Sequence, residues 1–274
     1  MRFNLYCHLT RMKKVLFPSL CVVVLFLITD CSKTNDDYVS LFNGTNLDGW
    51  YAKIRSNDAA LANKVFSVHN EAIHVYKDFP EAYELNTGEN NTHGMLYTKD
   101  KYSKFILKFE YKWGKGIANN FDKYQYDAGV YYHVVDDKIW PKGIEYQVRY
   151  NHITNRNHTG DFWAPKIDWY SLDGKTYTPK EKGGKLLVKP GEHLGLKNFE
   201  NYQALNNEWN QCEIIVMGNT YVIHKLNGDI VNMATNLPNK EGLIGFQAET
   251  AEILYRNIKI KVFEENIPMD HFLN

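Results

Sequence analysis

The sequence predicts an all-β protein, folded as a jelly-roll sandwich of two antiparallel sheets. Short segments of alternating apolar and polar residues recur along the chain, and no long stretch has the three- and four-residue apolar spacing of a helix. Two tight turns containing Asn and Gly, at Met217–Thr220 and Leu226–Asp229, join three consecutive segments into a meander. Many short strands joined in this way favour two packed sheets, because each strand then buries one face.

The predicted strands are rich in β-branched and aromatic residues, which suit a pleated, half-buried surface. In chain order they are Lys64–His69, Ala72–Tyr76, Gly94–Thr98, Lys104–Trp113, Ala128–Val134, Ile144–Tyr150, Gln211–Met217, Tyr221–Lys225, Ile230–Met233, Gly242–Glu249 and Ile253–Val262. Between Asn151 and Asn210 only Leu186–Val188 has a strand pattern. The aromatic residues of this long segment favour an ordered loop, and long loops in compact domains are commonly functional.

The N-terminal segment has the pattern of a secretory leader. Lys13 and Lys14 precede an apolar run, Val15–Ile28. This run is about 14 residues long, which is too short for a membrane span of roughly 20. Leu27–Cys31 resembles the lipobox of bacterial lipoproteins, in which the cysteine receives the lipid. We therefore expect lipidation at Cys31, with an ordinary secretory signal as the alternative.

These features divide the chain into a leader over residues 1–31, a polar tether over 32–39, one folded domain over 40–265 and a C-terminal tail over 266–274. We expect an exported protein in the periplasm or outer membrane, attached to the membrane only through its lipid anchor. Of the four cysteines only Cys212 lies in the folded part, so neither an internal disulfide nor a cysteine-rich metal site is expected.

The composition bears on the partner of the protein. Lys plus Arg and Asp plus Glu each number 32, and no basic stripe is visible, so nucleic acid is not an expected partner. Aromatic residues make up 14% of the chain. Sugar-binding sandwiches share this richness because a ring face stacks on a pyranose, although β-rich cores share it as well.

Three predicted strands carry ionisable groups on one face. Because side chains alternate across a strand, each of three sets lies on one side of its strand. The sets are Lys108, Glu110 and Lys112; Asp127, Gly129, Tyr131 and His133; and Glu145, Gln147, Arg149 and Asn151. We predict that the three strands are neighbours in one sheet and form a single polar binding surface, with space for a ligand at Gly129. A solvated sheet face with cross-strand ion pairs is the alternative.

The opposite faces of these strands should form part of the core. We expect burial of the apolar residues Phe105, Leu107, Phe109, Tyr111, Tyr146 and Val148.

Motifs along the chain resemble the 3-keto-disaccharide hydrolase domain family. The segment Leu41–Trp50, LFNGTNLDGW, is similar to the opening signature of this family. Further matching segments follow in order: Lys104–Trp113, Asp127–Gly129, Gly143–Gln147, Thr159–Gly160, Glu208–Asn210, Leu226–Gly228, Gly242–Gln247 and Tyr255–Ile260. The resemblance spans essentially the whole mature chain. It implies a concanavalin-like jelly roll that acts on 3-keto-glycosides, whose glucose unit is oxidised at C3.

The implied chemistry assigns roles to the polar surface. A C3 carbonyl acidifies the C2 proton, so a base removes it, an enolate forms, the C1 substituent leaves and water adds later. The candidates are His133 or Glu145 as base, Arg149 or Lys112 as enolate stabiliser, and Tyr131 or Glu110 as acid. Candidate substrate-binding residues are Lys112, Asp127, Gln147, Arg149, Trp163 and Trp169. The cofactor is unknown: a divalent metal could serve as the electrophile, but no ligand set is identified.

Two other functions stay open. Direct hydrolysis of an unoxidised glycan by a retaining enzyme needs two carboxyl groups about 5–5.5 Å apart. Related β-glucanases place Glu, Asp and Glu at alternate positions of one strand, where this chain has Glu145, Gln147 and Arg149. A non-catalytic, lectin-like surface lipoprotein would need only stacking aromatic rings and hydrogen-bonding amides. The expected partner is in each case an oligosaccharide or a 3-keto-glycoside.

Overall fold

The computed structural model describes residues 38–79, 91–118, 126–163, 166–187 and 201–273. The predicted leader with Cys31, most of the tether, and Val188 lie outside the described residues. Within the described part the regular secondary structure is nearly all β-strand, with α1 the one α-helix, which confirms the predicted class. No helix among these residues is both long and apolar enough to cross a membrane.

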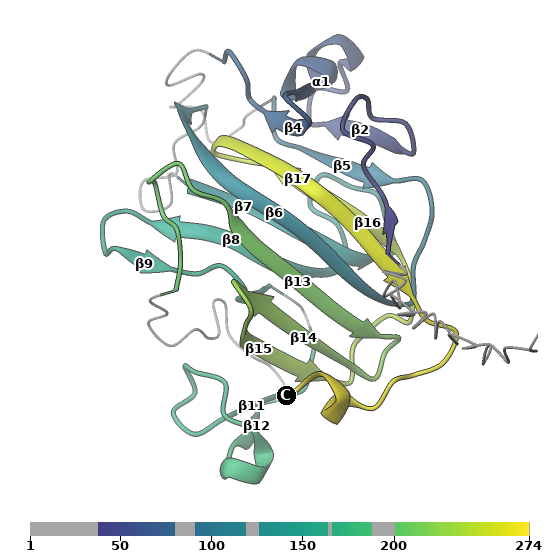
Figure 1. Ribbon diagram of the computed structural model, residues 1–274, viewed down its shortest axis with the longest axis vertical. Helices are drawn as coiled ribbons and strands as arrows, with labels where there is room; N and C mark the ends of the chain where they lie inside the picture. The colour runs from purple at the N-terminus through teal and green to yellow at the C-terminus, as the bar shows by residue number, and fades with distance from the viewer. Residues whose placement is uncertain (1–37, 80–90, 119–125, 164–165, 188–200, 274) are drawn as a thin grey trace, which may run out of the picture. The chain divides into compact units, whose positions relative to one another are not determined.

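Two antiparallel sheets make up the domain. Sheet A has the strand order β15-β14-β13-β6-β17-β4-β3, with β1 paired to β17, and it faces the viewer in Figure 1. Its strands are β1 (Val39–Ser40), β3 (Phe66–His69), β4 (Ala72–Val75), β6 (Lys104–Ile117), β13 (Asn210–Met217), β14 (Tyr221–Leu226), β15 (Asp229–Thr235) and β17 (Ala251–Val262).

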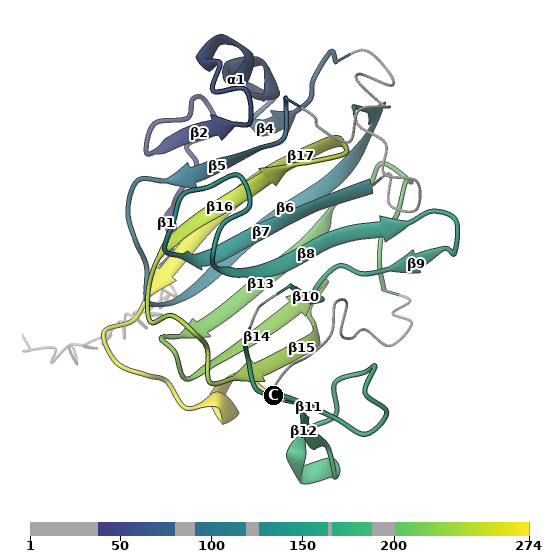
Figure 2. The same ribbon diagram turned by 180° about the vertical axis from the view of Figure 1, so that it is seen from behind.

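Sheet B has the order β10-β8-β7-β16-β5-β2, with β9 paired to β8, and it faces the viewer in Figure 2. Its strands are β2 (Trp50–Ile54), β5 (Gly94–Thr98), β7 (Tyr126–Val134), β8 (Ile144–Asn151), β9 (Arg156–Asn157), β10 (Phe162–Trp163) and β16 (Leu243–Ala248). A separate pair, β11 (Trp169–Ser171) and β12 (Lys185–Leu187), lies in the long segment after β10. The two packed sheets confirm the predicted jelly-roll sandwich of concanavalin-like type.

The core lies between the sheets. Each apolar residue expected to be buried on β6 and β8 is at most 1% exposed. Aromatic edges join the two layers, for example the rings of Phe109 and Tyr146, whose centroids are 5.7 Å apart. The alternation therefore identified correctly which face of each strand is buried.

Both predicted hairpins are present. They connect β13 to β14 and β14 to β15, and these three strands are consecutive neighbours in sheet A. Gly218, Asn227 and Gly228 have φ angles of 55°, 49° and 90°, which Asn and Gly adopt at low cost.

The segment before β3 differs from the prediction. Residues Ala59–Val65 form α1, so the strand expected to begin at Lys64 begins at Phe66. The Asp58 side chain caps this helix by accepting hydrogen bonds from the amides of Ala60 and Leu61. A helix of two turns is too short to show a clear apolar repeat, so the pattern missed it.

The prediction that three polar strands are neighbours in one sheet is wrong. β7 pairs with β8 in sheet B, whereas β6 pairs with β13 and β17 in sheet A. The polar faces of β6 and β8 therefore lie on opposite sides of the sandwich. Alternation tells which face of a strand is buried but not against which sheet it packs.

Candidate active site

The polar faces of β7 and β8 meet on the outer face of sheet B. The strand register places Asp127 opposite Arg149, Gly129 opposite Gln147, and Tyr131 opposite Glu145. Directly opposite residues of an antiparallel pair project from the same face. This part of the predicted surface is therefore present.

A pocket of about 220 Å³ opens on this face. It is lined by Asp127, Tyr131, Trp140, Glu145, Gln147, Arg149, Trp163, Gln247 and Glu249. Three carboxyl groups, one guanidinium and two indole rings thus line one small pocket. Such a convergence of titratable groups is typical of a functional site.

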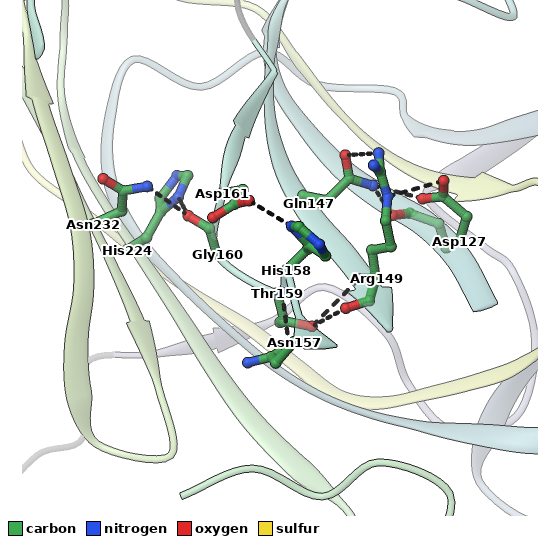
Figure 3. Close-up of polar contacts among 11 residues, drawn as sticks. Asp127, Gln147, Arg149, Asn157, His158, Thr159, Gly160, Asp161, His224 and Asn232 are labelled. Carbon is green, nitrogen blue, oxygen red and sulfur yellow. Dashed lines mark hydrogen bonds and ion pairs between the residues drawn. The ribbon is translucent and has the colours of Figure 1, made fainter. Parts of the chain in front are cut away.

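Asp127, Gln147 and Arg149 form a closed polar triangle (Figure 3). The Arg149 Nε lies 3.0 Å from Asp127 Oδ2, and Arg149 Nη2 donates to Gln147 Oε1 at 2.6 Å. Gln147 Nε2 donates to Asp127 Oδ1 at 2.7 Å and also to the Ala128 carbonyl at 2.9 Å. Burial raises the pKa of Asp127, and the Arg149 guanidinium acts against that rise. A buried charge pair needs such additional hydrogen bonds to be tolerated.

Glu145 is 4% exposed, and its side chain lies over Gly129. A Cβ at Gly129 would stand only 1.9 Å from Glu145 Oε1. The space at Gly129, which the sequence assigned to a ligand, is therefore occupied by the Glu145 carboxyl. The glycine positions a candidate catalytic group rather than the substrate itself.

Burial raises the pKa of Glu145 to about 8. A hydrogen bond from the Tyr131 hydroxyl lowers it, the nearby Asp127 charge raises it, and Arg149 lowers it. Burial, followed by the Glu145 charge, raises the pKa of Tyr131 well above its usual value. At neutral pH Glu145 is therefore mostly protonated, and its ionised form is a stronger base than an ordinary carboxylate.

Glu249 is a site residue that the sequence analysis did not identify. It lies between β16 and β17, where Thr250 Oγ1 accepts a hydrogen bond from the Asp127 amide at 2.7 Å. Burial, together with the charges of Asp127 and Glu145, raises the pKa of Glu249 well above its usual value. Gln247 lines the same pocket, and alternation from Gln247 to Glu249 was the signal that could have revealed both.

The segment Asn157–Asp161 runs alongside β8 and is joined to it by backbone hydrogen bonds, and Figure 3 shows its polar contacts. Thr159 Oγ1 accepts a hydrogen bond from the Arg149 amide at 3.3 Å, and His158 Nδ1 lies 3.0 Å from Asp161 Oδ2. His224 of β14 reaches the Gly160 carbonyl with Nδ1 at 2.9 Å. Burial lowers the pKa of His224 to about 3, so this imidazole is a neutral donor that ties the loop to sheet A.

His133 is not in the pocket. It has a φ angle of 51° at a register shift between β7 and β16, where regular alternation ends. Its side chain is fully buried, its Nε2 lies 2.9 Å from the Ser103 carbonyl, and its ring contacts Phe105 of the core. The prediction of His133 as a residue of the polar site is wrong because the bulge turns its side chain inward.

Glu110 and Lys112 also lie away from the pocket, on the outer face of sheet A. Glu110 pairs with Arg256 at 2.7 Å and accepts a hydrogen bond from Asn257 at 2.9 Å. Lys112 donates to Asn207 at 2.9 Å and lies over the Trp209 ring. The prediction that these two residues lie beside Glu145 is wrong, because β6 belongs to sheet A and Glu145 is on β8 of sheet B.

The two tryptophans predicted to bind substrate have different surroundings. Trp163 is 40% exposed and lines the pocket. Trp169 is fully buried, and its Nε1 donates to Asn232 Oδ1 at 2.8 Å. Trp169 is therefore a core residue that the long segment contributes, and its predicted binding role is wrong.

The sequence analysis allowed a divalent metal as the electrophile, and the placement of the described side chains does not indicate a site for one. In the part of the chain that the structure describes, no three His, Cys, Asp or Glu side chains are grouped so that they could hold a metal ion. The pocket carboxyl groups are instead hydrogen-bonded or placed beside Arg149.

Gly129→Ala is expected to destabilise the fold by about 1–3 kcal/mol, because the new methyl overpacks against Glu145. It should also displace the Glu145 carboxyl and reduce any activity that depends on it. Thermal denaturation and rate measurements would check both effects. Gly116→Ala is a matched control, since a Cβ there meets Glu252 at an ordinary 3.5 Å. Equal stability and rate in Gly129→Ala and wild type would contradict the assignment.

A jelly-roll sandwich with a pocket of carboxyl groups and indole rings on one sheet face defines a class of carbohydrate-active proteins. The chain belongs to the family of 3-keto-alpha-glucoside-1,2-lyase-like domains, whose model matches residues 37–261. This match confirms the resemblance to the 3-keto-disaccharide hydrolase domain family found in the sequence motifs.

Solved structures with the same fold come from Parabacteroides distasonis ATCC 8503. One, a "putative glycosyl hydrolase", is 21% identical with a TM-score of 0.51 and covers 84% of this chain and 98% of its own. A second structure with the same description is 20% identical with a TM-score of 0.51, and the match covers 82% of this chain and 99% of that one. No curated protein sequence matches the chain.

Proposed function

We propose that the protein cleaves 3-keto-glycosides by base-initiated elimination, with the pocket on sheet B as its active site. The family supports a carbohydrate-active protein. The observation that carries the finer proposal is Glu145, a buried carboxyl group whose pKa is about 8, in a pocket with a fixed cation and a second carboxyl of raised pKa. Elimination next to a carbonyl needs these three parts: a base, a stabiliser of the enolate and an acid.

The placement of side chains reduces the candidates for each role. His133, Lys112 and Glu110 lie outside the pocket, and we therefore assign the base to Glu145 and the enolate stabiliser to Arg149. Glu249 joins Tyr131 as a candidate acid. We assign the acid role to Glu249, because the high pKa of Tyr131 makes its hydroxyl a weak acid.

The proposed reaction proceeds as follows. The Glu145 carboxylate takes the C2 proton, and the electrons of the C2–H bond form an enolate on the C3 oxygen near the Arg149 charge. Collapse of the enolate restores the C3 carbonyl, forms a C1–C2 double bond and expels the C1 oxygen, which takes a proton from Glu249. Water added across the double bond then gives the free 3-keto sugar.

Incubation with defined substrates tests this proposal. We expect release of the aglycone from 3-keto-glucosides and 3-keto-disaccharides, and none from the same glycosides without the ketone. Reactions with and without Mn²⁺ or Ca²⁺ would show whether a metal contributes. Cleavage of native disaccharides at equal rates would support direct hydrolysis instead. Binding without cleavage would favour the lectin-like alternative.

We also propose export and attachment through a lipid on Cys31, which rests on the lipobox pattern alone. Cys31→Ala is expected to move the protein from the membrane fraction to the soluble periplasmic fraction, since the substitution removes the acylated thiol. Fractionation followed by immunoblotting measures this change. An unchanged distribution would indicate an ordinary secretory signal, and Cys212→Ala serves as the control.

A further inference from the structure

Two indole rings are left in contact with solvent at the pocket. All six tryptophans of the chain lie in the described part, and only Trp140 and Trp163 are exposed, at 46% and 40%. Both of them line the pocket that holds Glu145. Large apolar rings stay exposed at a cost in free energy, so exposed rings that share one pocket indicate a ligand-binding role.

Trp163 is fixed directly beside Glu145. Strand β10 pairs with β8 so that Trp163 is the register partner of Glu145, and the two side chains project from the same face. Two backbone hydrogen bonds hold the segment before β10 on β8: the Gly160 amide donates to the Gln147 carbonyl at 2.8 Å, and the Gln147 amide donates to the Asp161 carbonyl at 3.0 Å. Trp163 is thus positioned by strand pairing at the edge of sheet B.

Trp140 is held by the connection between β7 and β8, residues 135–143. The Asp137 carboxylate pairs with Lys53 at 2.7 Å and accepts a hydrogen bond from the Tyr51 hydroxyl at 3.1 Å, both on β2. The Tyr97 hydroxyl of β5 donates to the Lys138 carbonyl at 2.6 Å.

Tyr51 and Tyr97, which hydrogen-bond to this connection, belong to a small apolar cluster on the outer face of sheet B. This cluster consists of Met95, Tyr97, Tyr131 and Val134, with Tyr51 and Leu243 packed against it. The His93 ring meets the Trp140 ring edge-on, with centroids 5.7 Å apart. Trp140 is therefore positioned before any ligand binds, which reduces the entropy lost on binding.

The size of the pocket limits what the two rings can hold. Its volume of about 220 Å³ lies below the roughly 300–1,000 Å³ of sites for drug-sized ligands. One sugar ring, with an apolar face of C–H groups and a rim of hydroxyls, combines the surfaces that indole rings and carboxyl groups recognise.

We propose that Trp140 and Trp163 form an aromatic clamp that binds one pyranose unit above Glu145, and that the Asp137 anchor sets the position of Trp140. This inference deepens the proposed function, since it concerns the same pocket. It implies that the substrates are small glycosides or chain ends, which present a single terminal sugar, rather than internal units of a polysaccharide.

Calorimetric titration tests the clamp without turnover if the Glu145→Gln protein is used. The probes are methyl 3-keto-α-glucoside and methyl α-glucoside. Adding Trp140→Ala or Trp163→Ala to that protein is expected to weaken binding about tenfold or more, the usual loss when an aromatic ring that a ligand covers is truncated. Trp209→Ala, on the outer face of sheet A against Arg256, is the matched control and should leave binding within twofold.

A double-mutant cycle tests the anchor. Asp137→Asn should weaken binding severalfold, and Asp137→Asn combined with Trp140→Ala should bind no more weakly than Trp140→Ala alone, because Asp137 acts through that ring. Additive losses would overturn the anchoring role, since they would show that Asp137 acts independently of Trp140.

The outcomes separate the clamp from the proposed function. Weaker binding in both Trp→Ala variants without cleavage by the wild type would support the clamp and overturn the elimination reaction. Cleavage by the wild type with unchanged affinity and KM in both variants would overturn the clamp and leave the reaction standing. No binding of either sugar by the Glu145→Gln protein would also overturn the clamp.

Discussion

Glu145→Gln is expected to lower the rate of 3-keto-glycoside cleavage by about 10²–10⁴, the usual loss when a positioned acid or base is removed. The amide is nearly the same shape as the carboxyl, and it can still accept a hydrogen bond from Tyr131. It cannot take up the C2 proton. Because the change also removes a carboxyl whose pKa is raised by burial, the variant should be at least as stable as wild type at pH 8.

The pH profile gives a second measure of the same role. If the ionised form of Glu145 is the base, kcat/KM should rise with pH through about 8, and it should fall again once Glu249, the assigned acid, loses its proton. The residual rate of Glu145→Gln should lack this rise.

Glu110→Gln is the matched control for Glu145→Gln. Glu110 is also a carboxyl group on the outer face of a sheet. It lies in sheet A, however, where it pairs with Arg256 of the neighbouring strand β17. Its substitution should change the rate by less than a few fold, since Glu110 does not line the pocket and its ion pair lies on the outer face of sheet A. A wild-type rate in Glu145→Gln, or an equal loss in both variants, would contradict the assignment of the base.

The sequence predicted which strand faces are buried, because alternation is a local property of the chain. It could not predict which strands become neighbours. β6 has the same alternation as β8, yet long-range pairing with β13 and β17 places it in sheet A. The alternation correctly placed Glu110 and Lys112 on an outer sheet face, but that face belongs to sheet A and not to sheet B, which carries the pocket.

Local irregularities account for the other differences. The positive φ angle of His133 breaks the alternation of β7, and no residue in that segment signals a bulge. Trp140 lies in a connection whose fold depends on Asp137 reaching Tyr51 and Lys53, far away in sequence. By contrast, Asp127, Tyr131, Glu145, Gln147 and Arg149 follow from alternation in two adjacent strands, and all of them line the pocket.

Arg149→Met is expected to destabilise the protein by about 3–5 kcal/mol, the usual cost of leaving a buried charge without its partner. Methionine keeps much of the apolar volume but removes the cation from Asp127 and from the two neighbouring glutamates. For a domain of this size each kcal/mol lowers Tm by about 2–4 °C. Thermal denaturation should therefore show a fall on the order of 10 °C at pH 8.

The size of this loss should depend on pH in a defined direction. The folded-state pKa of Glu145 lies near 8, above its ordinary value of 4.5, so the folded protein holds a proton in this window that the unfolded chain releases. Stability therefore falls as the pH rises from about 4.5 to 8, and loss of the Arg149 cation raises the pocket pKa values further and steepens that fall. At pH 5, where more of the pocket carboxyl groups are protonated, Arg149→Met should lower the free energy of unfolding clearly less than at pH 8.

Adding Asp127→Asn should recover part of the loss at pH 8, because the amide needs no counterion and can still accept the hydrogen bond from Gln147. Equal losses at both pH values, with no recovery in the double variant, would mean that Arg149 stabilises the fold by packing rather than by its charge.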